Sequence, residues 1–88
     1  MIEREIEIKN KLGLHARPAA LFVKTASSFN SKIEVCRDDT VIDGKSIMGL
    51  MMLAAESGSK LKLKIDGDDE ERAMEKLVKL IEENFNEA

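Results

Sequence analysis

The sequence predicts an α/β (α+β) domain, an open-faced sandwich in which helices cover one face of a β-sheet. Two observations support this. Segments in which apolar and charged residues alternate with the period of a strand lie near both ends of the chain. Segments with the 3.6-residue period of an amphipathic helix follow each of them. A length of 88 residues suits a single domain, 1–88, with one core.

The first expected strand has one apolar and one acidic face, because Ile2, Ile6 and Ile8 alternate with Glu3, Glu5 and Glu7. A loop over 10–14 follows. A helix is expected over 16–28, where apolar residues recur at i, i+3, i+4 and i+7 spacing. Pro18 fits its first turn, where an amide proton would have no partner.

The next elements are a β-hairpin and a short helix. Strands over 32–37 and 40–42 are joined at Asp38 and Asp39. Ser46 is the expected N-cap of a helix over 47–53. The last strand alternates Leu61, Leu63 and Ile65 with Lys60, Lys62 and Lys64. Acidic residues over 68–71 begin the final helix, whose apolar stripe is Met74, Leu77, Val78, Ile81 and Phe85.

The charged faces of the first and last strands constrain the order of the sheet. Unlike charges directly opposed across an antiparallel pair stabilise it by roughly 0.2–1 kcal/mol each. The glutamates of the first strand therefore match the lysines of the last, and we expect these two strands to be neighbours. The result is a split βαβ arrangement, with helices on the apolar face and water on the charged face.

Charge and composition exclude several classes of protein. The net charge is −3, which argues against a nucleic-acid binder. The N-terminal segment lacks the features of a signal peptide, and the longest apolar run, 47–55, is too short to span a bilayer. The only cysteine, Cys36, excludes an internal disulfide and suits a reducing compartment, so we expect a cytoplasmic protein. Cys36 itself has no expected role, because Ile33 and Val35 occupy the buried face of their strand.

His15, the only histidine, stands directly before the first expected helix, and Arg17 follows two residues later. A helix N-terminus carries N–H groups without intrahelical partners and a partial positive charge, so it binds phosphate readily. This arrangement suits a phosphoryl group carried on histidine. In the alternative reading, His15 is a structural or surface residue and Arg17 is a solvated residue at the helix start. An arginine there is nevertheless unfavourable unless an anion offsets it.

Two blocks, Gly-Leu-His-Ala-Arg-Pro-Ala at 13–19 and Gly-Lys-Ser-Ile-Met-Gly-Leu-Met at 44–51, give the chain a specific resemblance. It resembles HPr, the histidine-containing phosphocarrier family of the bacterial sugar phosphotransferase system, over its whole length. The resemblance implies an antiparallel four-stranded sheet of order 1-4-2-3 with three helices on one face.

The resemblance also implies the chemistry. His15 would accept a phosphoryl group on Nδ1 from a phosphohistidine of enzyme I and pass it to a IIA domain of a sugar permease. Arg17 would stabilise the phosphate, with the backbone amides of Ala16 and Arg17. Such a protein is a stoichiometric carrier rather than an enzyme. It needs no cofactor or metal, and it is expected to be a monomer that neither binds nucleic acid nor inserts into membranes.

The second block implies regulation and docking. In some relatives the serine at Ser46 is phosphorylated by an HPr kinase/phosphorylase, which directs the carrier towards a transcriptional regulator. The residues expected to dock partners are Lys24, Lys45, Ile47, Met48 and Met51.

Three positions depart from the pattern common in the family: Leu12, Met52 and Ala54. They leave open a nitrogen-branch paralogue, and a mainly regulatory HPr-like protein is another alternative. A different class, an RNA-binding split βαβ domain, is disfavoured because the chain has no Tyr or Trp for its open sheet face.

Overall fold

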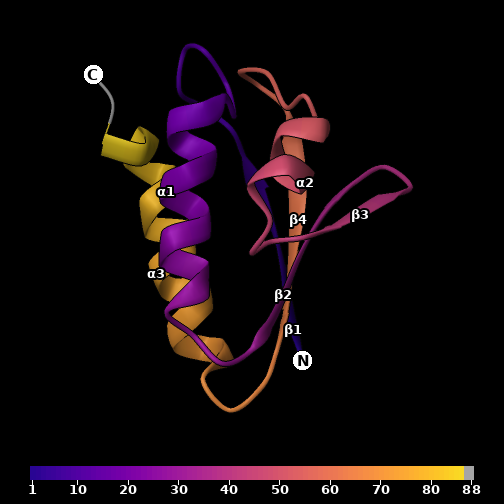
Figure 1. Cartoon of the computed structure of the whole chain (residues 1–88), viewed down its shortest axis with the longest axis vertical. Helices are drawn as coiled ribbons and strands as arrows, with labels where there is room; N and C mark the ends of the chain where they lie inside the picture. Colours follow the sequence, from indigo (N-terminus) through magenta and orange to yellow (C-terminus); the bar gives the residue numbers. More distant parts are fainter. Residues whose placement is uncertain (87–88) are drawn as a thin grey trace.

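The computed structural model describes residues 1–86 of the chain. Figure 1 shows a sheet with α1 and α3 side by side against it and α2 near one end. The elements in chain order are β1 (Ile2–Glu7), α1 (Ala16–Ser27), β2 (Lys32–Arg37), β3 (Thr40–Asp43), α2 (Ile47–Met52), β4 (Lys60–Asp66), α3 (Glu70–Glu82) and the 3₁₀ turn η1 (Asn84–Asn86). The expected α+β class is confirmed.

The sheet is antiparallel with the order β1-β4-β2-β3, as the resemblance implied. Its apolar face forms one core with the helices. The largest fully buried side chains of this core include Ile8, Ile33, Leu50, Leu63 and Leu77. The core is therefore mainly aliphatic, and the three phenylalanines of the sequence, Phe22, Phe29 and Phe85, are all part of it.

The predicted pairing of the first and last strands is confirmed residue by residue. Glu3, Glu5 and Glu7 lie opposite Lys64, Lys62 and Lys60 in turn. The Nζ atoms of Lys62 and Lys64 both lie 3.9 Å from carboxylate oxygens of Glu3. Exposed pairs of this kind add little stability, so they mainly fix the register: a slip by one residue would move the isoleucines of β1 to the wet face.

Several element boundaries differ from the expected ones. α1 ends one residue early, because the hydroxyl and backbone amide of Ser28 both bond to the carbonyl oxygen of Thr25. α2 ends at Met52, with Leu53 as its C-cap, and β3 extends to Asp43. These differences are of the usual size at helix and strand ends.

Phe85 reaches the core by a route that the sequence pattern did not predict. The pattern placed it in the final helix, but that helix ends at Glu82. Asn84, Phe85 and Asn86 then have φ angles of 55°, 56° and 62°. This left-handed turn delivers Phe85 to the core with 2% of its surface exposed. The flanking asparagines tolerate the left-handed region better than most residues do.

Cys36 is more protected than we expected. It lies opposite Lys62 in the β2–β4 ladder, so it projects from the charged face of the sheet. Only 7% of its surface is exposed. Glu5, Val41 and Lys62 line a hollow of the surface together with it, and long charged side chains cover neighbouring apolar atoms with their methylene groups. Ile33 and Val35 do occupy the core face of β2, as expected, and Cys36 is shielded on the opposite face.

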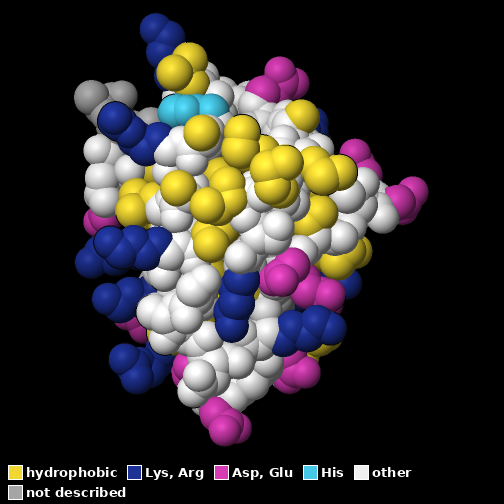
Figure 2. All heavy atoms as spheres, viewed as in Figure 1, with side chains coloured by type: hydrophobic (Ala, Val, Ile, Leu, Met, Phe, Trp, Pro, Cys, Tyr) yellow, Lys and Arg dark blue, Asp and Glu magenta, His cyan; other side chains and the backbone are white. Residues whose placement is uncertain are grey.

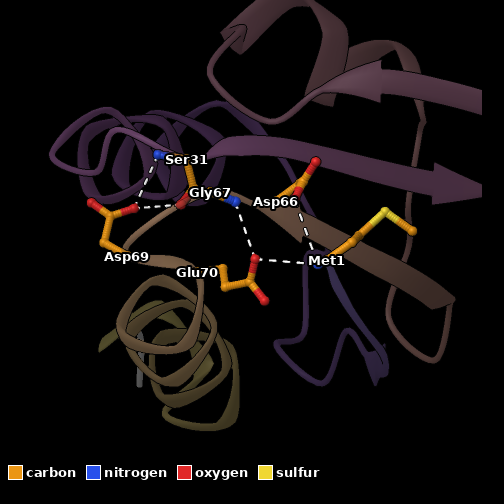
Figure 3. A network of polar contacts seen from close by, with 6 residues as sticks. All are labelled: Met1, Ser31, Asp66, Gly67, Asp69 and Glu70. Atoms are coloured by element: carbon orange, nitrogen blue, oxygen red, sulfur yellow. Dashed lines mark hydrogen bonds and ion pairs between the residues drawn. The ribbon is translucent and has the colours of Figure 1, made fainter.

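Asp69 ties the start of α3 to the loop between α1 and β2 (Figure 3). Its carboxylate accepts hydrogen bonds from the amides of Asn30 and Ser31 at 2.9 and 3.0 Å, and from the hydroxyl of Ser31. The Ser31 hydroxyl, followed by the Asn30 amide, holds the pKa of the Asp69 carboxyl below its ordinary value of 3.8. The ionised carboxylate therefore stabilises the fold.

Glu70 forms a second part of this network. Its Oε1 atom accepts a hydrogen bond from the Gly67 amide at 3.1 Å and lies 3.3 Å from the Met1 amino group. Asp66 Oδ1 lies 3.5 Å from the same amino group. The hydrogen bond to Glu70 raises the pKa of the Met1 amino group above its ordinary value of 8.0. These contacts hold the start of β1 against the start of α3.

We predict that Asp69→Asn lowers the melting temperature at pH 7. A depressed carboxyl pKa contributes stability above the unfolded-state pKa and loses it as the pH falls through the folded-state pKa. The difference between the two proteins should therefore shrink below the ordinary value of 3.8. Thermal unfolding followed by circular dichroism from pH 7 to pH 2 measures this. Asp68→Asn, at the exposed neighbouring residue, is the control, and an equal loss in both variants would contradict the role of Asp69.

Candidate functional site

The site is built around the first residue before α1. His15 is the N-cap, with φ −81° and ψ −170°, and its side chain makes no capping hydrogen bond. Its backbone carbonyl accepts a hydrogen bond from Ala19 at 3.0 Å. The side chain is half-buried. The imidazole therefore stands at the end of the helix and leaves the capping position to another acceptor.

The first turn of α1 is arranged for an anion. Pro18 has no N–H, and the Ala19 amide bonds to the His15 carbonyl, so Ala16 and Arg17 supply the amides that the helix itself does not use. The turn contains no acidic residue, and the Arg17 side chain is exposed. A cation at the positive end of the dipole is unfavourable by itself, whereas a bound anion would reverse the sign.

The loop after α2 contacts the backbone that leads to His15. The Leu14 amide donates to the Ala55 carbonyl at 2.7 Å, and the Asn10 side-chain amide donates to the Gly13 carbonyl at 2.6 Å. Gly13 has a φ of +72°, and a Cβ there would lie 2.5 Å from the Ala55 oxygen. Only glycine fits this approach. The backbone before His15 is therefore fixed against the loop that follows α2.

Both ends of α2 are capped. Ser46 Oγ accepts a hydrogen bond from the Gly49 amide at 3.0 Å, which confirms the predicted N-cap. At the other end, Arg37 Nη1 donates to the carbonyl oxygens of Leu53 and Ala54 at 2.9 and 3.0 Å. The contribution of Arg37 could not be predicted from the sequence. No local signal points to it, because it lies 16 and 17 residues from its partners.

The exposed face of α2 is apolar. Four side chains, which we call the α2 patch, are 41%, 71%, 42% and 78% exposed: Ile47, Met48, Met51 and Met52. Their spacing places them on one side of the helix. Figure 2 shows hydrophobic side chains gathered over this region and reaching the cyan side chain of the only histidine. Leu12, in the loop before His15, is 72% exposed as well. The sequence pattern did not point to Leu12 as a docking residue.

The two lysines expected to dock partners lie away from His15. Lys45 is half-buried, and its Nζ donates to the Phe29 carbonyl at 2.8 Å, just beyond the far end of α1. Lys24 is in the last turn of α1 and lines a groove with Leu80 and other residues of α3. The helix rises about 1.5 Å per residue, so nine residues separate Lys24 from His15 by roughly 13 Å.

Neither a metal centre nor a membrane span is found in the described part of the chain. Residues 1–86 contain no group of three or more His, Cys, Asp or Glu side chains placed to hold a metal ion. None of the helices in this range has the length and apolar character needed to cross a bilayer.

The chain matches a family model described as "PTS HPr component phosphorylation site" over residues 2–83. It belongs to the HPr family. The phosphocarrier protein HPr of Neisseria meningitidis is 52% identical over 99% of this chain and 98% of its own length. The HPr-like protein Crh of Halalkalibacterium halodurans is 51% identical over 93% of this chain and 98% of its own length.

Solved HPr structures share the fold. HPr-C-His from Thermoanaerobacter tengcongensis is 57% identical, with a TM-score of 0.96, and the match covers 100% of this chain and 99% of that one. A crystal structure of an HPr dimer from the same organism matches with a TM-score of 0.80 over 99% and 100% of the two chains. Since a family member forms a dimer, the expected monomer stays a prediction.

Ala54 departs from the common HPr pattern in a way that the backbone makes visible. It directly follows the C-cap of α2 and has a φ of +51°. Glycine usually occupies this position after a helix, because it adopts the left-handed region without penalty. The residue therefore carries local strain beside the turn that supports His15.

We predict that Ala54→Gly raises the free energy of unfolding by about 0.5–1 kcal/mol. The left-handed region costs an L-residue roughly 1–2 kcal/mol, and the larger freedom of glycine in the unfolded chain offsets about 0.4–1 kcal/mol of that gain. Urea unfolding measures the change. Ala20→Gly, at an exposed position inside α1, is the matched control and should lose about 0.5–1 kcal/mol. A similar loss at Ala54 would contradict its left-handed conformation.

Proposed function

We propose that this HPr family member is a phosphocarrier that accepts a phosphoryl group on His15 from phospho-enzyme I and donates it to IIA domains of sugar permeases. The observation that carries the proposal is the start of α1. There, an imidazole, two helix-end amides and an arginine share one turn that has no acidic residue. The family match supports the same assignment.

The chemistry requires little apparatus. The lone pair of His15 Nδ1 attacks phosphorus, and the bond between phosphorus and the donor's histidine nitrogen breaks, with its electron pair returning to that nitrogen. Donation to a IIA histidine reverses the roles. Transfer of this kind depends on positioning and on stabilisation of the phosphoryl oxygens. The amides of Ala16 and Arg17 and the Arg17 guanidinium supply that stabilisation. The protein is a stoichiometric carrier.

The α2 patch is the proposed docking surface for enzyme I and IIA domains. An exposed apolar cluster of this kind marks an interaction site, and methionine side chains adapt to partners of different shape. Leu12, exposed in the loop that precedes His15, supplies a further apolar side chain for docking. Lys24 and Lys45 act at longer range, where their charge attracts acidic partners. The partners are thus expected to meet the protein around the imidazole.

We predict that incubation with enzyme I and phosphoenolpyruvate adds one phosphoryl group that is labile in acid and stable in base. Intact-mass spectrometry measures the product. His15→Ala should accept none, because no other imidazole exists in the chain. Arg17→Glu should slow acceptance at least tenfold, since a charge-assisted contact becomes a repulsion. Wild-type acceptance by His15→Ala would show that the acceptor lies elsewhere.

A second role, regulation through Ser46, is supported by the geometry of the α2 N-cap and by the resemblance to an HPr-like Crh protein. Ser46 Oγ lies 3.0 Å from the Gly49 amide, where phosphate oxygens are favourable acceptors. The modification by an HPr kinase/phosphorylase would therefore leave the fold intact. It would add about two negative charges beside Ile47, and a transcriptional regulator would bind the phosphorylated surface.

We predict that Ser46→Asp keeps the melting temperature within a few degrees of wild type, because aspartate is also a good N-cap. Phosphorylation of His15 should become at least tenfold slower, since a charge now borders the apolar docking surface. Initial rates of phosphoryl transfer at several enzyme I concentrations measure the effect. Ser27→Asp, which adds the same charge near the far end of α1, is the control. Equal rates in both variants would remove the mechanism of the switch.

A further inference from the structure

Arg37 lies at the end of β2, outside the proposed phosphoryl site. It is nevertheless hydrogen-bonded to the turn after α2, which contacts the backbone before His15. One nitrogen of its guanidinium, Nη1, donates to the Leu53 carbonyl at 2.9 Å and to the Ala54 carbonyl at 3.0 Å. Its side chain is half-buried. The last carbonyls of a helix have no intrahelical partners and carry a partial negative charge, so a cation stabilises them.

The turn after α2 contains a strained residue and requires contacts that stabilise it. Ala54 has a φ of +51°, a region that alanine leaves when nothing fixes it. The amides of Leu53 and Ala54 bond back to Leu50 and Met51 at 3.2 and 3.1 Å, which closes the helix end. Arg37 donates to the carbonyls of the same two residues. The amide and the carbonyl of both Leu53 and Ala54 are therefore hydrogen-bonded.

Ala55, the next residue, connects this turn to the backbone that precedes His15. The Ala55 carbonyl accepts the Leu14 amide at 2.7 Å, and the backbone of Gly13 packs against the same oxygen. Leu14 is 6% exposed and directly precedes His15. Arg37 is thus linked to the N-cap of α1 through two sets of hydrogen bonds, its own to the carbonyls of Leu53 and Ala54 and that of Leu14 to Ala55, and neither involves the imidazole itself.

We propose that Arg37 is a positioning residue for phosphoryl transfer: by holding the 53–55 turn, it fixes the backbone that presents His15. This inference rests on the proposed function of His15. A phosphoryl acceptor must be aligned with its donor, and a displacement of about 1 Å can slow a reaction by about a hundredfold. Loss of Arg37 frees one turn of backbone, so the expected effect is smaller, about tenfold.

The test measures two quantities in Arg37→Gln. The rate of phosphoryl transfer from phospho-enzyme I to His15 should fall about tenfold. The hydrogen exchange of the Leu14 amide, followed by NMR without any partner, should become about tenfold faster, since opening of the turn releases its acceptor. Arg72→Gln removes the same charge from an exposed position on α3 and should change neither quantity. Arg37→Lys keeps a cation that can donate to both carbonyls, so transfer should stay within about threefold of wild type.

Glycine at position 54 separates positioning from a direct contact with the donor. Glycine adopts the left-handed region without strain, so the turn no longer depends on Arg37. In the Ala54→Gly background, Arg37→Gln should therefore change transfer and Leu14 exchange by less than about twofold. Such non-additivity shows that the two positions are coupled, as expected if Arg37 acts through the turn at position 54.

Three results would overturn the proposal: unchanged Leu14 exchange in Arg37→Gln, a wild-type transfer rate in that variant, or an equal loss of transfer with alanine and with glycine at position 54. The last result would show that Arg37 contacts the donor. If the wild-type protein accepts no phosphoryl group on His15, the proposed function fails, and with it the role of Arg37 in transfer. Faster Leu14 exchange in Arg37→Gln would then show only that Arg37 orders the loop.

Discussion

The pairing of β1 with β4 is the constraint on which the rest of the structure depends. It joins segments about 60 residues apart and places β4 inside the sheet, between β1 and β2. The pairing continues beyond the strands, because the Ile8 amide bonds to the Ser59 carbonyl at 2.9 Å and the Gly58 amide bonds to the Ile8 carbonyl at 2.7 Å. The loops before α1 and after α2 therefore meet at the same end of the sheet. The contact between Leu14 and Ala55 is possible only because they do.

The first turns of the two long helices differ in charge and in polar contacts. α3 begins with Glu70 and Glu71, which complement its dipole, and with Asp69, whose carboxylate is bound by another loop. α1 begins with no acid and with the exposed cation of Arg17. The same chain thus completes one helix start internally and leaves the other open to an anion. A local rule is broken at one place, and departures of this kind concentrate where proteins act.

Much of this molecule could be predicted from its sequence, because the decisive signals are local or periodic. Charge alternation gave the pairing of β1 with β4, and Ser46 before an apolar run gave the cap of α2. Three features could not be predicted: the bonds of Arg37 to the end of α2, the bond from Lys45 to Phe29, and the left-handed turn of Phe85. The first two join residues 16 or more positions apart. The third replaces a helix that the same periodicity would equally fit.

The methionines are divided between two environments with different chemical fates. Met74 is buried in the core at 7% exposure, whereas Met48 and Met52 present most of their surface to solvent. Oxidation to the sulfoxide turns a flexible apolar side chain into a polar, chiral one. Peroxide would therefore reach the α2 patch long before the core. Oxidation would therefore change the binding of partners at this surface while the sheet and its helices stay folded. Methionine sulfoxide reductases could reverse the change.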